Sequence, residues 1–371
     1  MKVQSAKPFF EEKDIPFILE DIKKILKNGR LTKGQKVEQF EKEFAEYIGT
    51  KYAIAVNSGT SALDIILRYF DVRDKEVIVP TNSCVASANA VIFAGGTPIL
   101  ADTDPKTLCI DPKDILKKIT SKTKGVMIVH LAGLICPQIN EIIKICEKHN
   151  LFLIEDAAQA HGATIDNKKA GSLTEVGCFS FYPTKIITTG EGGIITTDNE
   201  KLAEFAKNFR NHGINEEDEL HHEIGHNLRM SEINAILGIY QLKNIENNLK
   251  RRKEIVRGYQ EKLEKIKGIS FIEIPSNINH SYYKYPILLN GKITAQELTK
   301  IFEKKYNIQL GTLYDTPIHL QPAYKKKYGY KEGMLPQTEK IVKKEICLPL
   351  FQEISDEQID YIIQALKKEI F

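Results

Sequence analysis

Seven short apolar runs between residues 52 and 197 constrain the fold of this chain more than any other feature. Each run is apolar throughout rather than alternating, as expected of strands whose two sheet faces are both covered. Amphipathic stretches typical of helices lie between the runs, for example Ser61–Phe70 and Glu141–His149. The alternation predicts an α/β fold with a mostly parallel sheet. The predicted strands are Tyr52–Val56, Glu76–Val79, Pro98–Ala101, Gly125–Val129, Leu151–Ile154, Val176–Ser180 and Gly193–Thr197.

The pattern changes beyond Asn227. A long helical pattern covers Met230–Arg257, and two predicted strands, Gly268–Ile274 and Lys284–Leu289, come before a last helix at Asp356–Glu369. Because 371 residues are many for one domain, we expect two. The prediction is a large α/β domain over residues 1–250 and a smaller C-terminal α+β domain over 251–371, with the N-terminal segment able to pack against the smaller one.

The composition excludes several classes of partner. The 52 basic and 49 acidic residues nearly cancel, so nothing indicates binding to nucleic acid or to an anionic membrane. The six cysteines form no C-x-x-C pair and are typical of free thiols in a reducing compartment. No secretory signal precedes the charged start, and no apolar run reaches the ~20 residues of a membrane span. We therefore expect a cytoplasmic protein.

Three polar features point to one chemistry. Lys185 precedes the glycine-rich Thr188–Gly193, Asp156 follows a predicted buried strand, and Asn57–Ser61 joins a strand to a helix. A lysine amine can form a Schiff base with the aldehyde of pyridoxal phosphate (PLP), and a carboxylate can keep the ring nitrogen protonated. Loop N–H groups at a helix start can hold the phosphate. Each feature alone also fits a simpler interpretation: a solvated lysine, a capped strand end or an ordinary turn.

The combination resembles the DegT/DnrJ/EryC1/StrS family of PLP enzymes, which are mostly sugar aminotransferases with the fold-type I architecture of aspartate aminotransferase. The resemblance runs nearly end to end and is specific because the motifs occur in the family's order. The matching segments are Gly29–Gly34, Glu38–Glu41, Asn57–Leu63, Glu155–Gly162, Phe179–Lys185, Gly190–Gly193, Asn211–Gly213, Asn227–Met230, Pro317–His319 and Leu348–Pro349.

The resemblance implies a role for each site residue. Lys185 would be the Schiff-base lysine and the general base and acid that shuttles the proton, Asp156 the partner of the ring nitrogen, and Gln159 a contact to the ring's 3-hydroxyl. Another set would hold the phosphate: Gly59, Thr60, Ser180 and, from the second subunit of a homodimer with shared active sites, Asn227. Glutamate is the expected amino donor, and PLP alternates with pyridoxamine phosphate (PMP).

The segments that shape the mouth of the site depart from the family pattern. Cys84 stands where an aromatic residue usually stacks on the cofactor ring, and Gly133–Gln138 differs from the usual segment after His130. The acceptor is expected to be a nucleotide-linked keto sugar for glycan biosynthesis, with a small phosphorylated ketone such as dihydroxyacetone phosphate as the alternative. We expect the substrate to contact Tyr314, His319 and Arg229. The alternative is loop packing for Tyr314 and His319 and a structural ion pair for Arg229.

Two other functions compete with transamination. His222, Glu223 and His226 fit the H-E-x-x-H zinc-hydrolase motif, with Glu246 available as a third ligand. Their acidic flank lacks the apolar helix that would bury a metal, so we expect no metal site. The second alternative is a regulatory protein that binds PLP without turnover; Lys185 argues only against the related dehydratases, which carry histidine at that position.

Overall fold

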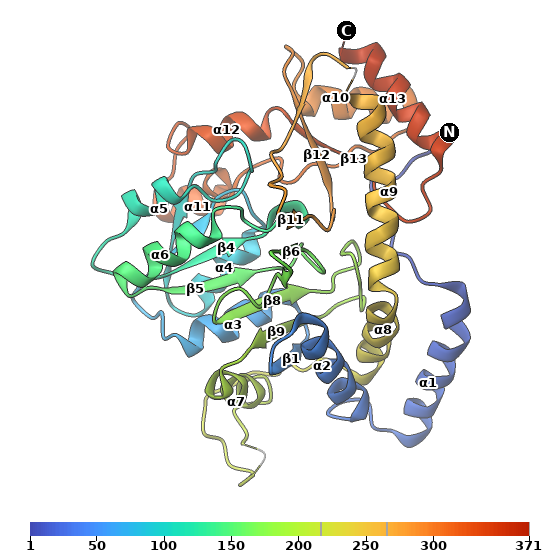
Figure 1. Cartoon of the computed structure of the whole chain (residues 1–371). Helices are drawn as coiled ribbons and strands as arrows, with labels where there is room; N and C mark the ends of the chain where they lie inside the picture. The colour runs from blue at the N-terminus through green and yellow to red at the C-terminus, as the bar shows by residue number, and fades with distance from the viewer. Residues whose placement is uncertain (216, 265, 371) are drawn as a thin grey trace.

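The computed structural model describes residues 1–215, 217–264 and 266–370 (Figure 1). Its main element is a seven-stranded sheet with the order β1-β9-β8-β5-β4-β2-β3, and it contains all seven predicted strands. Six of them run in one direction, and β9 lies antiparallel to both neighbours, so the sheet is mixed but mostly parallel. The strands are β1 (Tyr52–Val56), β2 (Glu76–Pro80), β3 (Thr97–Ala101), β4 (Thr123–Val129), β5 (Phe152–Asp156), β8 (Val176–Ser180) and β9 (Gly193–Thr197).

Helices cover both faces of this sheet, which explains the continuous apolar runs. Within β1, Ala53 and Ala55 belong to the core on one face, whereas Ile54 and Val56 belong to the core on the other. Helices α2 (Gln35–Ile48), α5 (Pro112–Lys118), α6 (Ile139–His149) and α8 (Glu232–Lys243) supply the first core, and α3 (Gly59–Tyr69), α4 (Val85–Phe93) and α7 (Glu200–Phe209) supply the second.

The direction of the strands gathers the predicted site residues at one edge. β1, β5 and β8 run the same way, so their carboxyl ends lie together. Asp156 ends β5, Ser180 ends β8, and Gly59 begins α3 just beyond β1. In open α/β sheets this edge is where ligands bind.

A second, three-stranded antiparallel sheet has a core of its own (Figure 1). The long helix α9 (Ile245–Leu263) passes from the large sheet to this smaller one. Val3 lies in the smaller core and pairs with Ile308, so the start of the chain packs beside the C-terminal elements. The division into domains at residue 250 stays a prediction. The elements here are β10 (Ile269–Phe271), β12 (Tyr285–Leu289), β13 (Glu345–Leu348), α10 (Ala295–Ile301), the π-helical segment η3 (Phe302–Tyr306) and α13 (Asp356–Ile370).

The structure differs from the prediction in several places, one of which is β13, a strand that was not predicted. The helix expected over Met230–Arg257 is two helices, because Asn244 leaves helical geometry and donates a hydrogen bond to Asp14 Oδ2 at 2.6 Å. A small sheet of β6 (Thr164–Ile165), β7 (Lys168–Lys169) and β11 (Ile278–Asn279) has strands too short to carry a periodic signal. The remaining elements are α1 (Ile15–Asn28), α11 (Pro322–Tyr328), α12 (Pro336–Val342) and the short segments η1 (Glu12–Asp14), η2 (Leu131–Gly133) and η4 (Ile318–Leu320).

None of the helices in the described part of the chain combines the length and the apolar character that a membrane crossing requires.

Candidate active site

A cavity of about 360 Å³ lies at the carboxyl edge of the large sheet. Its size is typical of a site for a small molecule. It brings together residues from segments that are far apart in the sequence. Eight of the predicted site residues line it, namely Gly59, Thr60, Cys84, Asp156, Gln159, Ser180, Lys185 and Tyr314.

The first wall of the pocket is the start of α3. Ser58 caps this helix by accepting a hydrogen bond from Ser61 N at 3.1 Å. A Cβ atom on Gly59 would lie 2.9 Å from Ser180 Cβ, so only glycine lets the helix start come this close to the end of β8. The N–H groups and the positive end of the helix dipole at this point favour an anion, and Thr60 and Ser180 add hydroxyl groups.

Asp156 is a buried carboxylate at the base of the pocket, only 5% exposed. Ser87 Oγ donates to Asp156 Oδ2 at 2.7 Å, and Ala158 N donates to Oδ1 at 3.2 Å. Burial raises the pKa of Asp156 in spite of these hydrogen bonds, because the charged form loses solvation. A cationic group placed against this carboxylate would favour its charged form.

Lys185 lies in the loop after β8, where its N–H donates to Tyr182 O at 2.9 Å. Its amine, Nζ, lies 4.7 Å from the centre of the Tyr283 ring, at the distance of a cation–π contact. The Tyr283 hydroxyl is 3.0 Å from Thr184 Oγ1. Burial raises the pKa of Tyr283, but the charges of Lys185 and Lys284 outweigh that effect and hold it below its usual value.

Gln159 joins two segments of the pocket. Its Oε1 accepts a hydrogen bond from Ala132 N at 2.8 Å, and its Nε2 donates to the Tyr314 hydroxyl at 2.9 Å. Burial raises the pKa of Tyr314 well above its usual value, so this phenol stays neutral. Cys84, by contrast, is exposed on the pocket wall just before α4, where it presents a thiol to whatever occupies the cavity.

Three of the predicted residues, His319, Asn227 and Arg229, lie away from this pocket wall. His319 is fully buried, and its ring nitrogens contact Thr81 Oγ1 at 2.8 Å and Glu339 Oε1 at 3.0 Å. It therefore supports the segment after β2 instead of meeting substrate as expected. Asn227 is exposed and pairs with Asn211 in an isolated antiparallel bridge, so its surface is available to another molecule.

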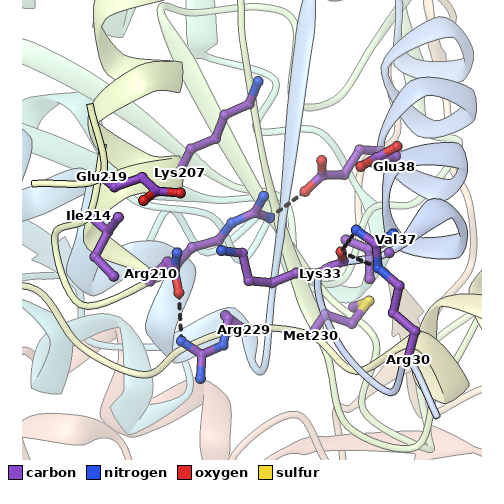
Figure 2. Close-up of a pocket in the computed structure, with 13 residues that line it drawn as sticks. Arg30, Lys33, Val37, Glu38, Lys207, Arg210, Ile214, Glu219, Arg229 and Met230 are labelled. Carbon is purple, nitrogen blue, oxygen red and sulfur yellow. Dashed lines mark hydrogen bonds and ion pairs between the residues drawn. The ribbon is translucent and has the colours of Figure 1, made fainter. Parts of the chain in front are cut away.

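Arg229 lies in a second cavity, of about 790 Å³ (Figure 2). Its Nη1 donates to Asn211 Oδ1 at 2.7 Å. Neither Arg229 nor Asn211 lines the first pocket. Arg210 enters the same cavity but is paired with Glu41 and the carbonyl of Ala55. Within this chain Arg229 thus makes a hydrogen bond to a neutral amide, and its contact with substrate stays a prediction.

The zinc-hydrolase alternative receives no support from the geometry. His222, Glu223 and His226 lie in a loop, whereas the motif needs a helix that places both histidines on one face. His222 Nε2 is 2.7 Å from Asp218 Oδ2, and Glu246 binds the Tyr47 hydroxyl. Over the described ranges, no group of three or more His, Cys, Asp or Glu side chains is arranged to hold a metal ion.

Sequence reasoning missed three residues that shape the pocket. Ser87 orients Asp156, and Tyr283 and Lys284 line the pocket. Ser87 lies in the first turn of α4, and the sequence carries no signal that its hydroxyl contacts Asp156. Tyr283 and Lys284 belong to no motif, since they reach the pocket only because the chain returns to it from the second sheet.

Comparisons with known proteins agree with this geometry. The model of the DegT/DnrJ/EryC1/StrS aminotransferase family matches residues 13–367. GDP-perosamine synthase of Caulobacter vibrioides is 38% identical over 78% of this chain and 79% of its own, and the spore coat polysaccharide biosynthesis protein SpsC of Bacillus subtilis is 35% identical over 94% and 93%.

A solved structure shares the whole fold. The Streptococcus pneumoniae sugar aminotransferase homologue Spr1654, solved in its PLP form, superimposes with a TM-score of 0.92 at 26% identity and covers 100% of both chains. The sequence match and the shared fold lead to one conclusion. This chain belongs to the DegT/DnrJ/EryC1/StrS aminotransferase family and is a PLP-dependent aminotransferase.

Proposed function

We propose that this chain transfers an amino group from glutamate to the keto group of a nucleotide-linked sugar, as a step in polysaccharide or glycan biosynthesis. The observation that carries the proposal is a single pocket that contains the Lys185 amine, the buried Asp156 carboxylate and the anion-binding start of α3. The names of the relatives, one a synthase of a GDP-linked amino sugar and one a polysaccharide biosynthesis protein, support the choice of acceptor.

The residues of the pocket fit PLP. The helix start at Gly59, with the Thr60 and Ser180 hydroxyl groups, is suited to the phosphate. Asp156 is buried and aimed into the same cavity, as the partner of a protonated ring nitrogen must be. Gln159 is placed for the 3-hydroxyl, and Cys84 for one face of the ring. When bound, PLP supplies an electron sink for the charge left on the substrate carbon that loses a proton.

Lys185 performs two roles in this proposal. Its Nζ would hold the cofactor through the aldehyde, and as a free amine it would be the general base for the proton on the substrate carbon. The same amine would return the proton as a general acid. The Tyr283 ring, 4.7 Å from Nζ, would restrict the movement of the free amine.

Asp156 acts by electrostatics. A carboxylate held by Ser87 and Ala158 cannot swing away, so its charge stays fixed where the cofactor's positive ring nitrogen would lie. Gln159 is also fixed, because its amide is held by Ala132 N and by the Tyr314 hydroxyl. The pocket is thus organised before the cofactor arrives.

We further propose a homodimer with shared active sites. Asn227 is exposed and cannot serve the pocket of its own chain, whose wall it does not reach. In the dimer it would contact the cofactor phosphate in the partner subunit. The second cavity beside Arg229 would then open toward that same site.

The test is a panel of acceptors. Purified protein with PLP and glutamate is incubated with keto-sugar nucleotides and with small phosphorylated ketones, and 2-oxoglutarate release is measured. We expect release with at least one keto-sugar nucleotide. Release only with a small keto-phosphate would select the alternative acceptor, and bound PLP without release in any arm would favour the non-catalytic regulatory protein.

A further inference from the structure

The walls of the active-site pocket carry a second cation besides Lys185. Of the described residues that line it, two are carboxylates, Asp156 and Glu191, and two are amines, Lys185 and Lys284. No arginine lines the pocket within the described ranges. Because the proposed function commits Lys185 to the cofactor, Lys284 is the remaining cation among the described residues of this chain that line the pocket.

The backbone around Lys284 is held firmly. Lys284 N donates to Ala132 O at 3.1 Å, and Arg252 Nη1 donates to Tyr282 O at 3.0 Å. Gly133 lies so close to this segment that a Cβ there would come within 2.9 Å of Tyr283 N. The position at which the Lys284 side chain leaves the backbone is therefore fixed relative to the pocket.

The Lys284 ammonium has unused hydrogen-bonding capacity. Its Nζ donates to Thr312 O, and an ammonium group carries three N–H donors. Among the described residues Lys284 forms no ion pair with a carboxylate. Glu345 lies nearby, but burial raises the pKa of its carboxyl to about 7, and its oxygens already accept from Leu313 N and Cys347 Sγ. An anionic ligand would complete this site.

We propose that Lys284 binds the α-carboxylate of the amino donor. This assignment rests on the proposed function, which supplies an amino acid as donor. Lys185 Nζ and Lys284 Nζ lie 4.7 and 5.9 Å from the centre of one ring, that of Tyr283, and both residues line the same pocket. In an amino acid the carboxylate is bonded to the carbon that loses its proton, so an anchor for that group also orients the proton toward Lys185.

The first test measures binding without turnover. Calorimetry records the affinity of 2-oxoglutarate, which has the same α-carboxylate, for the cofactor-free protein. We expect Lys284→Met to weaken binding about 10- to 100-fold, the usual effect of losing a charged hydrogen bond, and Lys284→Arg to restore most of it. Lys292→Met, which removes an exposed lysine outside the pocket, is the matched control. Equal affinities for wild type and Lys284→Met would overturn the proposal.

The second test separates the two ends of the donor. In single-turnover reactions of the PLP form, Lys284→Met should raise the half-saturating concentration of glutamate about 10-fold or more. The half-saturating concentration of 4-aminobutyrate, which lacks the α-carboxylate, should stay nearly unchanged in this variant. Equal losses for both amines, or a loss confined to a phosphorylated acceptor, would refute the assignment.

The two proposals fail in different ways. If the wild-type protein reacts with no amino donor, the proposed function is wrong, whereas the calorimetry still decides whether Lys284 binds a carboxylate. If the wild-type protein transaminates normally and Lys284→Met does the same, only the inference about Lys284 is wrong. Circular dichroism melting of each variant shows that a loss of binding is not a loss of fold.

Discussion

At the scale of single residues, burial and hydrogen bonding give Asp156 the property that its role requires. A carboxylate at the end of a strand is usually solvated, whereas Asp156 is 5% exposed and fixed by Ser87 Oγ. Burial raises its pKa, because the hydrogen bonds and the nearby charge of Lys185 only partly offset the lost solvation. A protonated ring nitrogen in contact with the carboxylate would favour its charged form.

We therefore predict separate effects on cofactor binding and on turnover for Asp156→Ala. The variant should still bind PLP, because Lys185 and the start of α3 are intact. Its turnover should fall about 100-fold or more, the usual loss when one fixed electrostatic partner is removed. Absorbance of the lysine-bound cofactor and steady-state kinetics measure the two effects. Turnover close to wild type would contradict the role proposed for Asp156.

The sequence was a good guide to those site residues that belong to local motifs. Gly59, Asp156 and Lys185 each follow a strand that could be predicted, and the strand directions place them at one edge. Lys284 could not be found in this way, because its approach to the pocket depends on contacts with Ala132 and Gly133, which are distant in the sequence. His319 shows the opposite error, since its motif placed it near the site but its ring faces Thr81 and Glu339.

At the scale of elements, continuous apolar runs predicted all seven strands of the large sheet because both faces of that sheet are covered. The strand β13 at Glu345–Leu348 was not predicted, although the run resembles the predicted Glu76–Val79 in its length and in its first residue. Glu345 begins β13, is fully buried and lies 2.9 Å from Leu313 N. Tertiary contacts, which periodicity does not encode, compensate for the buried polar group.

β13 should give the protein a measurable pH dependence of stability. Burial raises the pKa of Glu345 from 4.5 to about 7, so the folded state binds a proton more tightly than the unfolded state. Its contribution to stability is present below about pH 4.5 and is lost as the pH rises toward 7. Because glutamine does not titrate, the Glu345→Gln variant does not lose stability in this way as the pH rises.

The measurement for β13 compares urea denaturation of wild type and Glu345→Gln between pH 5 and pH 8. The difference in unfolding free energy should move in favour of the variant as the pH rises, by at most about 3 kcal/mol. The variant retains an oxygen that can accept from Leu313 N, so the comparison isolates the charge. A difference that stays constant with pH would show that Glu345 does not titrate in this range.

At the scale of the whole molecule, the pocket of one chain is incomplete if Asn227 acts in its partner. The two residues needed for one site, Lys185 and Asn227, would then come from different subunits. Asn227 is exposed, as such a contact requires of the isolated chain.

Shared sites predict complementation between inactive subunits. Lys185→Ala and Asn227→Asp proteins should each be nearly inactive, but a mixture allowed to exchange subunits should regain about a quarter of wild-type activity, because each hybrid dimer has one intact site. Native mass spectrometry confirms that hybrids form. Hybrid dimers without recovered activity would show that each subunit builds its site alone.

The whole account depends on a covalent bond between Lys185 Nζ and the cofactor aldehyde. The direct measurement is borohydride reduction of the PLP-loaded protein, followed by digestion and mass spectrometry of the peptides. We predict a reduced pyridoxyl group on Lys185 and its absence from Lys284, which lines the same pocket. A pyridoxyl group on another lysine, or none on a protein saturated with PLP, would contradict the account.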